Sequence, residues 1–244
     1  DTVYVMHEGL IHLLDPATGK TVKTFNVTDY DPQGTFWTFL AVSGEHLIAG
    51  SSVENYMTGS RTLTIMDRKT GQEKWSRSAT YHFRHNAIAA SDTTLFCLDR
   101  MTPRQLYVYK RLGVEPTGPS HLYALSLDTG KEIWSTEENV LGTWLGYSSR
   151  HDILIQAGSS ARDRASDESR TGVTAYRGKT GEVVWQNLKL SHTGPLLLHD
   201  DVFFTNGGAG GRAFDLLTGA IKKTVNPLTG KLQNLAFARN YGCS

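Results

Sequence analysis

The chain has 244 residues, with 25 Lys and Arg against 24 Asp and Glu, so its formal net charge is +1. This balance leaves no basic excess to neutralise phosphates, which argues against a nucleic acid as the partner. The 39% hydrophobic and 20% charged residues are typical of a folded chain, and no apolar run is long enough to predict a membrane-spanning helix.

The first predicted elements are three strands, at residues 3–5, 10–15 and 22–25. Apolar residues alternate along them, and the last two strands flank a turn that contains Thr18-Gly19. Glycine adopts the positive φ that such a turn needs without steric cost. We therefore expect a β-hairpin, and its pattern recurs four more times along the chain. The five Thr-Gly pairs are Thr18 and Gly19, Thr70 and Gly71, Thr129 and Gly130, Thr180 and Gly181, and Thr218 and Gly219.

Three copies place a Trp five residues after the Thr, at Trp75, Trp134 and Trp185, whereas Lys23 and Lys223 hold this place in the first and last copies. An indole ring offers a wide apolar surface that can cover a neighbouring sheet, and its N–H can reach a carbonyl. We expect all three Trp side chains to be structural.

Asp15, Asp67 and Asp215 each stand three residues before the Thr of a turn. Their carboxylates are expected to cap the turns through hydrogen bonds to the backbone. The two cysteines, Cys97 and Cys243, are too few for a disulfide framework or a zinc cluster, and the alternating apolar residues around Cys97 predict a buried thiol in a strand.

Two further strands are predicted before each later hairpin. They lie at 36–42 and 45–49, 87–90 and 94–98, 144–147 and 153–156, and 195–198 and 202–205. Four strands in about 40 to 60 residues are typical of a propeller blade. The predicted fold is therefore all-β, a β-propeller of four-stranded antiparallel blades at about residues 1–26, 36–76, 86–136, 143–187 and 194–234.

In the last ten residues, 235–244, the segment 235–239 resembles the first strand of another blade. It can complete the first blade of a five-bladed ring, which removes open sheet edges, or begin a sixth blade of a larger ring. The chain starts at Asp1 without a signal peptide and ends abruptly at Ser244, so we expect residues to be missing at one or both ends.

The segments 63–75 and 123–134 resemble the tryptophan-docking repeat of pyrroloquinoline-quinone-like propellers. The stretches 83–89 and 239–243 are also similar to bacterial members of this superfamily. The superfamily includes quinoprotein alcohol dehydrogenases and non-catalytic scaffolds of bacterial outer-membrane assembly. The resemblance therefore implies the fold and a bacterial periplasmic or extracellular location, but it does not choose an activity.

The dehydrogenase branch characteristically has two adjacent cysteines, a calcium site of Glu, Asn and Asp oxygens, and eight blades. The chain has no Cys-Cys pair, and its Glu-Asn neighbours are Glu54-Asn55 and Glu138-Asn139. We therefore expect no cofactor and a non-catalytic binding or scaffold module. The alternative is a quinoprotein oxidoreductase that depends on pyrroloquinoline quinone (PQQ) and calcium, with further blades outside this segment.

Long loops mark one face of the predicted propeller as the place for a protein partner or a small ligand. The turns within the hairpins and between the first two strands of a blade are short, whereas the other two loop classes, which include 76–86 and 100–121, are longer. Alternating strand directions bring both long classes to the same face, and binding residues collect on such loops. The insertion 101–114 could be a short helix there, with packing on its own blade favoured over contact with a partner. The candidate residues are His82, Arg84, His85, Asn86, Arg104, Tyr107, Tyr109, Trp144, Arg239 and Asn240, and no metal site is expected.

Overall fold

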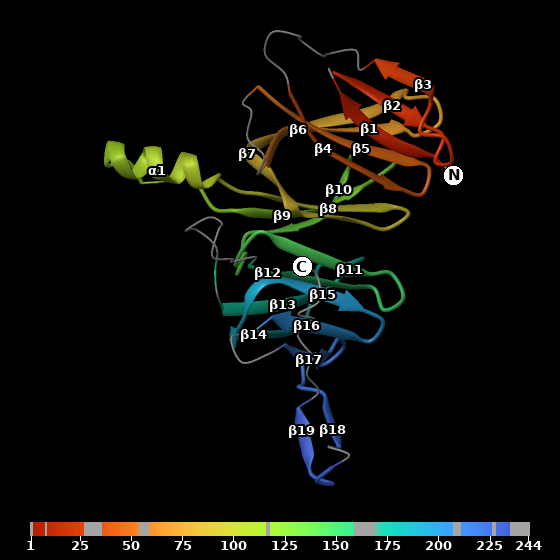
Figure 1. The fold of residues 1–244 in the computed structure, drawn as a ribbon. Helices are drawn as coiled ribbons and strands as arrows, with labels where there is room; N and C mark the ends of the chain where they lie inside the picture. The colour runs from red at the N-terminus through yellow and green to blue at the C-terminus, as the bar shows by residue number, and fades with distance from the viewer. Residues whose placement is uncertain are drawn as a thin grey trace, which may run out of the picture. The chain divides into compact units, whose positions relative to one another are not determined.

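The computed structural model describes residues 2–7, 9–26, 36–53, 59–115, 118–158, 169, 171–206, 211–225 and 228–234. These residues form antiparallel β-sheets and one α-helix (Figure 1). The chain divides into two compact units, residues 1–132 and 133–244.

The first unit contains two sheets and the helix. One sheet has the order β1-β2-β3, and in the other β4 to β9 lie side by side in chain order. The strands are β1 (Val3–His7), β2 (Leu10–Leu14), β3 (Thr21–Asn26), β4 (Phe36–Ser43), β5 (His46–Ser52), β6 (Gly59–Asp67), β7 (Glu73–Ala90), β8 (Thr94–Asp99) and β9 (His121–Ser126), and the helix is α1 (Pro103–Leu112).

The second unit contains the remaining sheets, with orders β11-β12-β13-β14, β15-β16-β17 and β18-β19. The strands are β11 (Trp144–Ser148), β12 (Ile153–Ala157), β13 (Thr171–Arg177), β14 (Val183–Ser191), β15 (Thr193–His199), β16 (Val202–Asn206), β17 (Arg212–Asp215), β18 (Lys223–Val225) and β19 (Leu232–Asn234), while β10 (Glu132–Thr136) begins at the last residue of the first unit. These antiparallel sheets confirm the all-β fold class and are those of a partial β-propeller.

Each unit has its own apolar core. In the first, Ile48 on β5, Ile65 on β6 and Leu95 on β8 are almost completely buried together with Cys97 on β8. This confirms the prediction for Cys97, and burial raises the pKa of its thiol. In the second unit, a separate core includes Ile155 and the stacked rings of Phe203 and Phe214.

One predicted loop is a strand. The segment 76–86 was expected to be a long loop, but it lies within β7, an unbroken strand of 18 residues. β7 pairs with β6 along 73–78 and again at Phe83 and Arg84, and it pairs with β8 at Phe83 and along 88–90. The pairing with β6 is interrupted between Ser78 and Phe83, and there the buried Asp99 carboxylate accepts the backbone N–H groups of Thr80 and Tyr81 at 2.6 and 2.8 Å. A side chain from the next strand therefore replaces a missing backbone partner, which local sequence patterns do not reveal.

The predicted Asp caps are confirmed. Asp67 Oδ1, for example, accepts the N–H groups of Lys69 and Thr70 at 3.0 and 2.8 Å. Asp15 and Asp215 make the same pair of contacts in their turns. Accepting backbone N–H groups favours the charged carboxylate, so the pKa of Asp67 lies below its ordinary value, mainly because of the hydrogen bond from Thr70 N.

The three indoles each contact the following Thr-Gly turn of their own unit. The Nε1–H groups of Trp75, Trp134 and Trp185 donate to the carbonyl oxygens of Leu127, Gly178 and Leu216 at 2.7, 2.6 and 2.9 Å. The rings lie on Gly130, Gly181 and Gly219, where a Cβ would come within 2.7 Å of an indole carbon in every case. Each Trp thus spans from one hairpin to the next turn.

The turn at Gly71 receives no Trp, because Lys23 holds that place. Instead, the Phe25 ring lies on Gly71, Tyr4 Oη donates to Arg68 O at 3.1 Å, and Lys23 Nζ donates to Lys69 O at 2.7 Å. Three side chains of β1 and β3 therefore supply the apolar cover and the donors that one indole supplies elsewhere. This replacement of an indole was not predicted from the sequence.

A sixth Thr-Gly turn, Thr229-Gly230, connects β18 and β19 and was not counted in the sequence analysis. Gly230 has a φ of +66°, as glycines in the other turns do, and a Cβ on it would meet nothing within 4 Å. The Thr229-Gly230 turn therefore has the left-handed glycine of the other Thr-Gly turns, but among the described residues no aromatic ring packs on this glycine.

Candidate binding site

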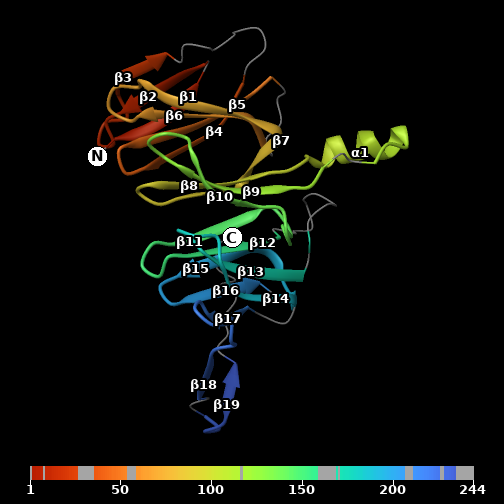
Figure 2. The same ribbon diagram turned by 180° about the vertical axis from the view of Figure 1, so that it is seen from behind.

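The insertion between β8 and β9 contains the helix α1, which confirms that its sequence can form one. Thr102 and Gln105 form a capping box, a Pro stands in the first turn, and Gly113 ends the helix with a left-handed φ of +65°. These features fix both ends of the helix through local hydrogen bonds and backbone preference. Figures 1 and 2 show α1 extending from the ends of β8 and β9, away from the strands of its unit.

Buried polar side chains hold the base of α1. His82 Nδ1 lies 3.1 Å from Gln105 Oε1, and Arg84 Nη1 donates to Met101 O at 2.7 Å. Gln105 Oε1 also accepts the backbone N–H of Thr102 at 2.8 Å, so it acts as an acceptor and the His82 proton lies on Nδ1. His82 and Arg84 are only 1% and 4% exposed. These two predicted face residues are therefore in a buried strand segment that supports the helix, not on an open loop.

Their neighbours on β7 lie differently. His85 is half-buried, with Nε2 at 3.0 Å from Ser60 Oγ and its ring 5.7 Å from that of Phe39. Asn86 is exposed. The cluster 81–86 thus changes along β7 from four buried residues, 81–84, to a half-buried His85 and an exposed Asn86.

On the helix itself, Arg104 and Tyr107 are exposed and Tyr109 is half-buried. The Arg111 guanidinium lies over the Tyr107 ring at 5.8 Å from its centroid. The preferred expectation, that this insertion packs on its own blade, is wrong for this side of the helix. Tyr107 is 60% exposed and Leu112 is 70% exposed.

The other predicted residues are not part of this arrangement in the described structure. Trp144 belongs to β11 in the second unit, where it is half-buried and packs against the core of that unit. Arg239 and Asn240 lie outside the described residues. Asp99, whose carboxylate orders the backbone of β7, was missed, although it directly follows the apolar run of β8.

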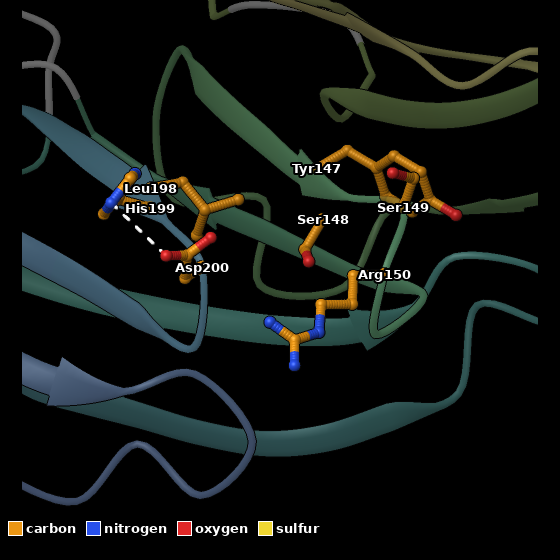
Figure 3. Close-up of a pocket in the computed structure, with 7 residues that line it drawn as sticks. All are labelled: Tyr147, Ser148, Ser149, Arg150, Leu198, His199 and Asp200. Atoms are coloured by element: carbon orange, nitrogen blue, oxygen red, sulfur yellow. Dashed lines mark ion pairs between the residues drawn. The ribbon is translucent and has the colours of Figure 1, made fainter.

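A pocket of about 240 Å³ lies in the second unit, at the short turns β11–β12 and β15–β16 (Figure 3). Long loops were expected to form the site, so the sequence analysis missed this pocket. Its lining is Tyr147, Ser148, Ser149, Arg150, Leu198, His199 and Asp200.

The charged groups around this pocket are paired. Arg150 Nη1 lies 3.6 Å from Asp201 Oδ1, and His199 Nε2 lies 3.4 Å from Asp200 Oδ2. Burial and the hydrogen bond from its hydroxyl to Asp152 raise the pKa of Tyr147 to about 12, so this phenol stays protonated at neutral pH. The pocket can hold a small polar group.

The described residues do not gather ligands for calcium. In the ranges that the structure covers, no three His, Cys, Asp or Glu side chains lie together so that they could hold a metal ion. Glu138 and Asn139 are exposed in a turn, and Glu54 and Asn55 lie outside the described residues. Among the described helices, none is long and apolar enough to cross a membrane.

The propeller fold has many counterparts among solved structures. BamB from Moraxella catarrhalis matches with a TM-score of 0.51 and 15% identity over 90% of this chain and 55% of that one. The quinohemoprotein alcohol dehydrogenase ADHIIG from Pseudomonas putida HK5 matches with a TM-score of 0.55 and 16% identity, over 95% of this chain and 43% of that one. The quinohemoprotein alcohol dehydrogenase from Comamonas testosteroni matches with a TM-score of 0.57 and 12% identity, over 96% of this chain and 44% of that one. The chain therefore spans about half the length of these relatives, and identities this low show the fold alone.

Sequence comparison identifies the family. No curated protein sequence matches the chain. A family model described as outer membrane protein assembly factor BamB matches residues 7–227, which is most of the chain. Together with the repeated Thr-Gly hairpins, this match shows that the chain belongs to the BamB-like family of PQQ-like β-propellers.

Proposed function

We propose that the chain is a non-catalytic propeller module that binds a protein partner in the bacterial envelope or outside the cell. The observation that carries this proposal is the use of the polar residues at the base of α1. His82 and Arg84 are buried and make hydrogen bonds to Gln105 and Met101, so they position a helix instead of lining an open ligand pocket. A rigid scaffold that presents a capped helix is suited to binding a macromolecule.

The residues also favour binding over quinone chemistry. Cys97 is buried in the centre of β8 and has no cysteine beside it in the sequence. Glu138 and Asn139 are exposed in a turn and not directed into a common site with other carboxylates among the described residues. A calcium-bound quinone needs several convergent oxygen ligands, so these groups do not support the oxidoreductase alternative.

The proposed location and the protein nature of the partner rest on the family. The matching model is described by an outer membrane assembly factor, and a protein of that description works with other proteins in the envelope. The same fold also occurs in alcohol dehydrogenases, so the family alone does not decide between binding and catalysis.

A reconstitution experiment tests the proposal. The full-length protein is incubated with PQQ and calcium, freed of excess reagent, and assayed for quinone absorbance and calcium content, beside a quinohemoprotein alcohol dehydrogenase as the positive control. We expect neither quinone nor calcium above the level of a β-propeller that binds no cofactor. One quinone and one calcium ion retained per chain would overturn the proposal in favour of an oxidoreductase.

A further inference from the structure

We infer that α1 is the docking element of this chain and that one of its faces inserts into an apolar groove with an acidic rim on a folded protein partner. This inference rests on the proposed binding function and adds the contact surface and the chemistry of the partner. The face consists of Arg104, Tyr107, Val108, Arg111 and Leu112 and is called the α1 stripe below.

The spacing of the α1 stripe places its five residues on one side of the helix. Counted from Arg104, the others follow at i+3, i+4, i+7 and i+8, the positions that form a continuous stripe on an α-helix. All five are exposed, whereas Gln105, Leu106 and Tyr109 on the other side are half-buried. One side of the helix is therefore partly buried, and the α1 stripe faces solvent.

The apolar side chains of the α1 stripe are strongly exposed to solvent. Tyr107, Val108 and Leu112 are 60%, 44% and 70% exposed. Val114, directly after the helix, is 45% exposed and extends this apolar surface. A short amphipathic helix with anchors at these spacings is the usual form in which a helix fills a groove on another protein. Contiguous exposed apolar groups of this kind mark interaction sites.

The positive charge of α1 indicates that the rim of the partner's groove is acidic. The helix contains Arg104, Lys110 and Arg111 but no Asp or Glu. Two of these cations lie within the α1 stripe, between the apolar anchors. A complementary surface must therefore bring carboxylates close to the apolar groove, where Arg can form bidentate hydrogen bonds.

The same arrangement disfavours a lipid surface. Helices that lie in a membrane interface separate an apolar face, which enters the acyl region, from a charged face that stays with the headgroups. In α1, burial of Tyr107, Val108 and Leu112 would carry the Arg104 and Arg111 guanidinium groups inward with them. A protein groove can satisfy these guanidinium groups with carboxylates, and the acyl region cannot.

The helix is formed before it binds. Its capping box, its left-handed Gly113 and the hydrogen bonds from His82 and Arg84 to its base fix it in place. A partner then does not have to order the segment, which lowers the entropic cost of association. This is an independent reason why the polar residues at the base are buried instead of exposed.

Site-specific photo-crosslinking in the source cells identifies the partner. A photoreactive amino acid replaces Val108 or Leu112 in the full-length protein. Lys110, exposed on a different side of the same helix, and Leu228, 93% exposed in the second unit, are the control positions. We expect a protein adduct at positions 108 and 112 and far less at 110 and 228, with the crosslinked partner residues lining an apolar groove bordered by Asp or Glu. No adduct at 108 and 112, or equal adducts at all four positions, would overturn the inference.

Binding measurements with the purified partner then test the chemistry. We expect Leu112→Gln to weaken binding about tenfold, and Arg104→Glu to weaken it and to reduce its salt dependence, whereas Leu228→Gln leaves it unchanged. Circular dichroism and thermal unfolding of each variant confirm that α1 and the propeller remain folded. Unchanged binding by Leu112→Gln would contradict the inference but leave the proposed binding function intact, because that function is tested separately by the assays for quinone, calcium and electron transfer.

A vesicle assay separates the membrane outcome. The full-length protein is sedimented with vesicles of phosphatidylcholine and phosphatidylglycerol. We expect no binding that depends on the α1 stripe. Sedimentation that is lost in Leu112→Gln but kept in Leu228→Gln would replace the protein groove by a lipid surface and overturn the inference.

Discussion

Gly130 lies so close to Trp75 that a Cβ on the glycine would come 2.7 Å from Cδ2 of the indole. Gly19 has nearly the same backbone conformation, with a φ of +67° against +69°, yet a Cβ on it would meet nothing within 4 Å. Both glycines belong to the first unit and to the same kind of Thr-Gly turn. The pair therefore separates the two reasons for which glycine stands in these turns, which are backbone strain and contact with a ring.

Replacing both glycines by alanine measures these contributions. Gly19→Ala should lower the free energy of unfolding by about 1 kcal/mol, because its only cost is the strain of an alanine in the left-handed conformation. Gly130→Ala should cost about 1–3 kcal/mol more, because the indole of Trp75 must also move. Urea unfolding of the two variants gives the difference. Equal losses would show that the ring contact is unimportant.

The substitute for an indole at Gly71 gives a second prediction. Tyr4→Phe removes the hydrogen bond to Arg68 O and should lower the free energy of unfolding by about 0.5–1.5 kcal/mol. Tyr107→Phe is the matched control, since this phenol is exposed on α1. If the two variants unfold at the same urea concentration, Tyr4 does not act as the donor that Trp supplies in other turns.

The base of α1 can be probed by limited proteolysis. Trypsin cuts after Arg104, Lys110 and Arg111, all of which lie in the helix, and cutting requires local opening. Gln105→Ala removes the acceptor for Thr102 N–H and for His82 Nδ1–H, a loss of about 1 kcal/mol.

Cleavage within α1 should therefore become about fivefold faster, because the open population rises in proportion. Gln72→Ala, at an exposed turn position, serves as the control and should leave this rate unchanged. An unaltered rate in Gln105→Ala would mean that the helix does not depend on these buried contacts.

The turn carboxylates predict an acid-dependent loss of stability. Hydrogen bonds from the turn backbone hold the pKa of Asp67 below its ordinary value of 3.8, so its stabilising contribution is complete above that value. The contribution is lost as the pH falls through the lowered pKa, because the protonated carboxyl accepts these bonds less well. Asp67→Asn should therefore flatten the decline in the urea midpoint between neutral pH and about pH 3. A decline as steep as that of the unmodified protein would contradict this role.

The thiol of Cys97 should be inert in the folded protein. It is fully buried in β8, and burial raises the pKa of the thiol, so little thiolate forms at neutral pH. In a Cys243→Ser background, a thiol-reactive dye should label Cys97 only after urea is added. Rapid labelling without urea would show that β8 opens in the native state.

The sequence predicts the repeated parts of this fold well because they depend on local chemistry. A Thr-Gly turn capped by Asp67 and a hairpin with Trp75 are encoded within about ten residues, and the structure has the predicted strands and caps. The burial of Cys97 was also predicted correctly, but all six residues of β8 are buried, so the run of apolar residues and not an alternation accounts for it.

The parts that could not be predicted depend on partners far along the chain. The continuity of β7 relies on Asp99, which accepts N–H groups 18 and 19 residues earlier. His82 and Arg84 have the composition of a surface cluster, but Gln105 and Met101 provide the hydrogen bonds that allow them to be buried. The replacement of an indole by Tyr4, Lys23 and Phe25 is likewise visible only once β1 and β3 lie beside the next turn.

An electron-transfer assay on the full-length protein tests most directly whether this chain is a binding module without oxidoreductase activity. The protein is supplied with PQQ, calcium, a panel of primary alcohols and an artificial electron acceptor, and the reduction of the acceptor is followed by absorbance. We expect a rate equal to that of the same mixture without protein. Reduction that requires the protein, the quinone and an alcohol together would contradict it.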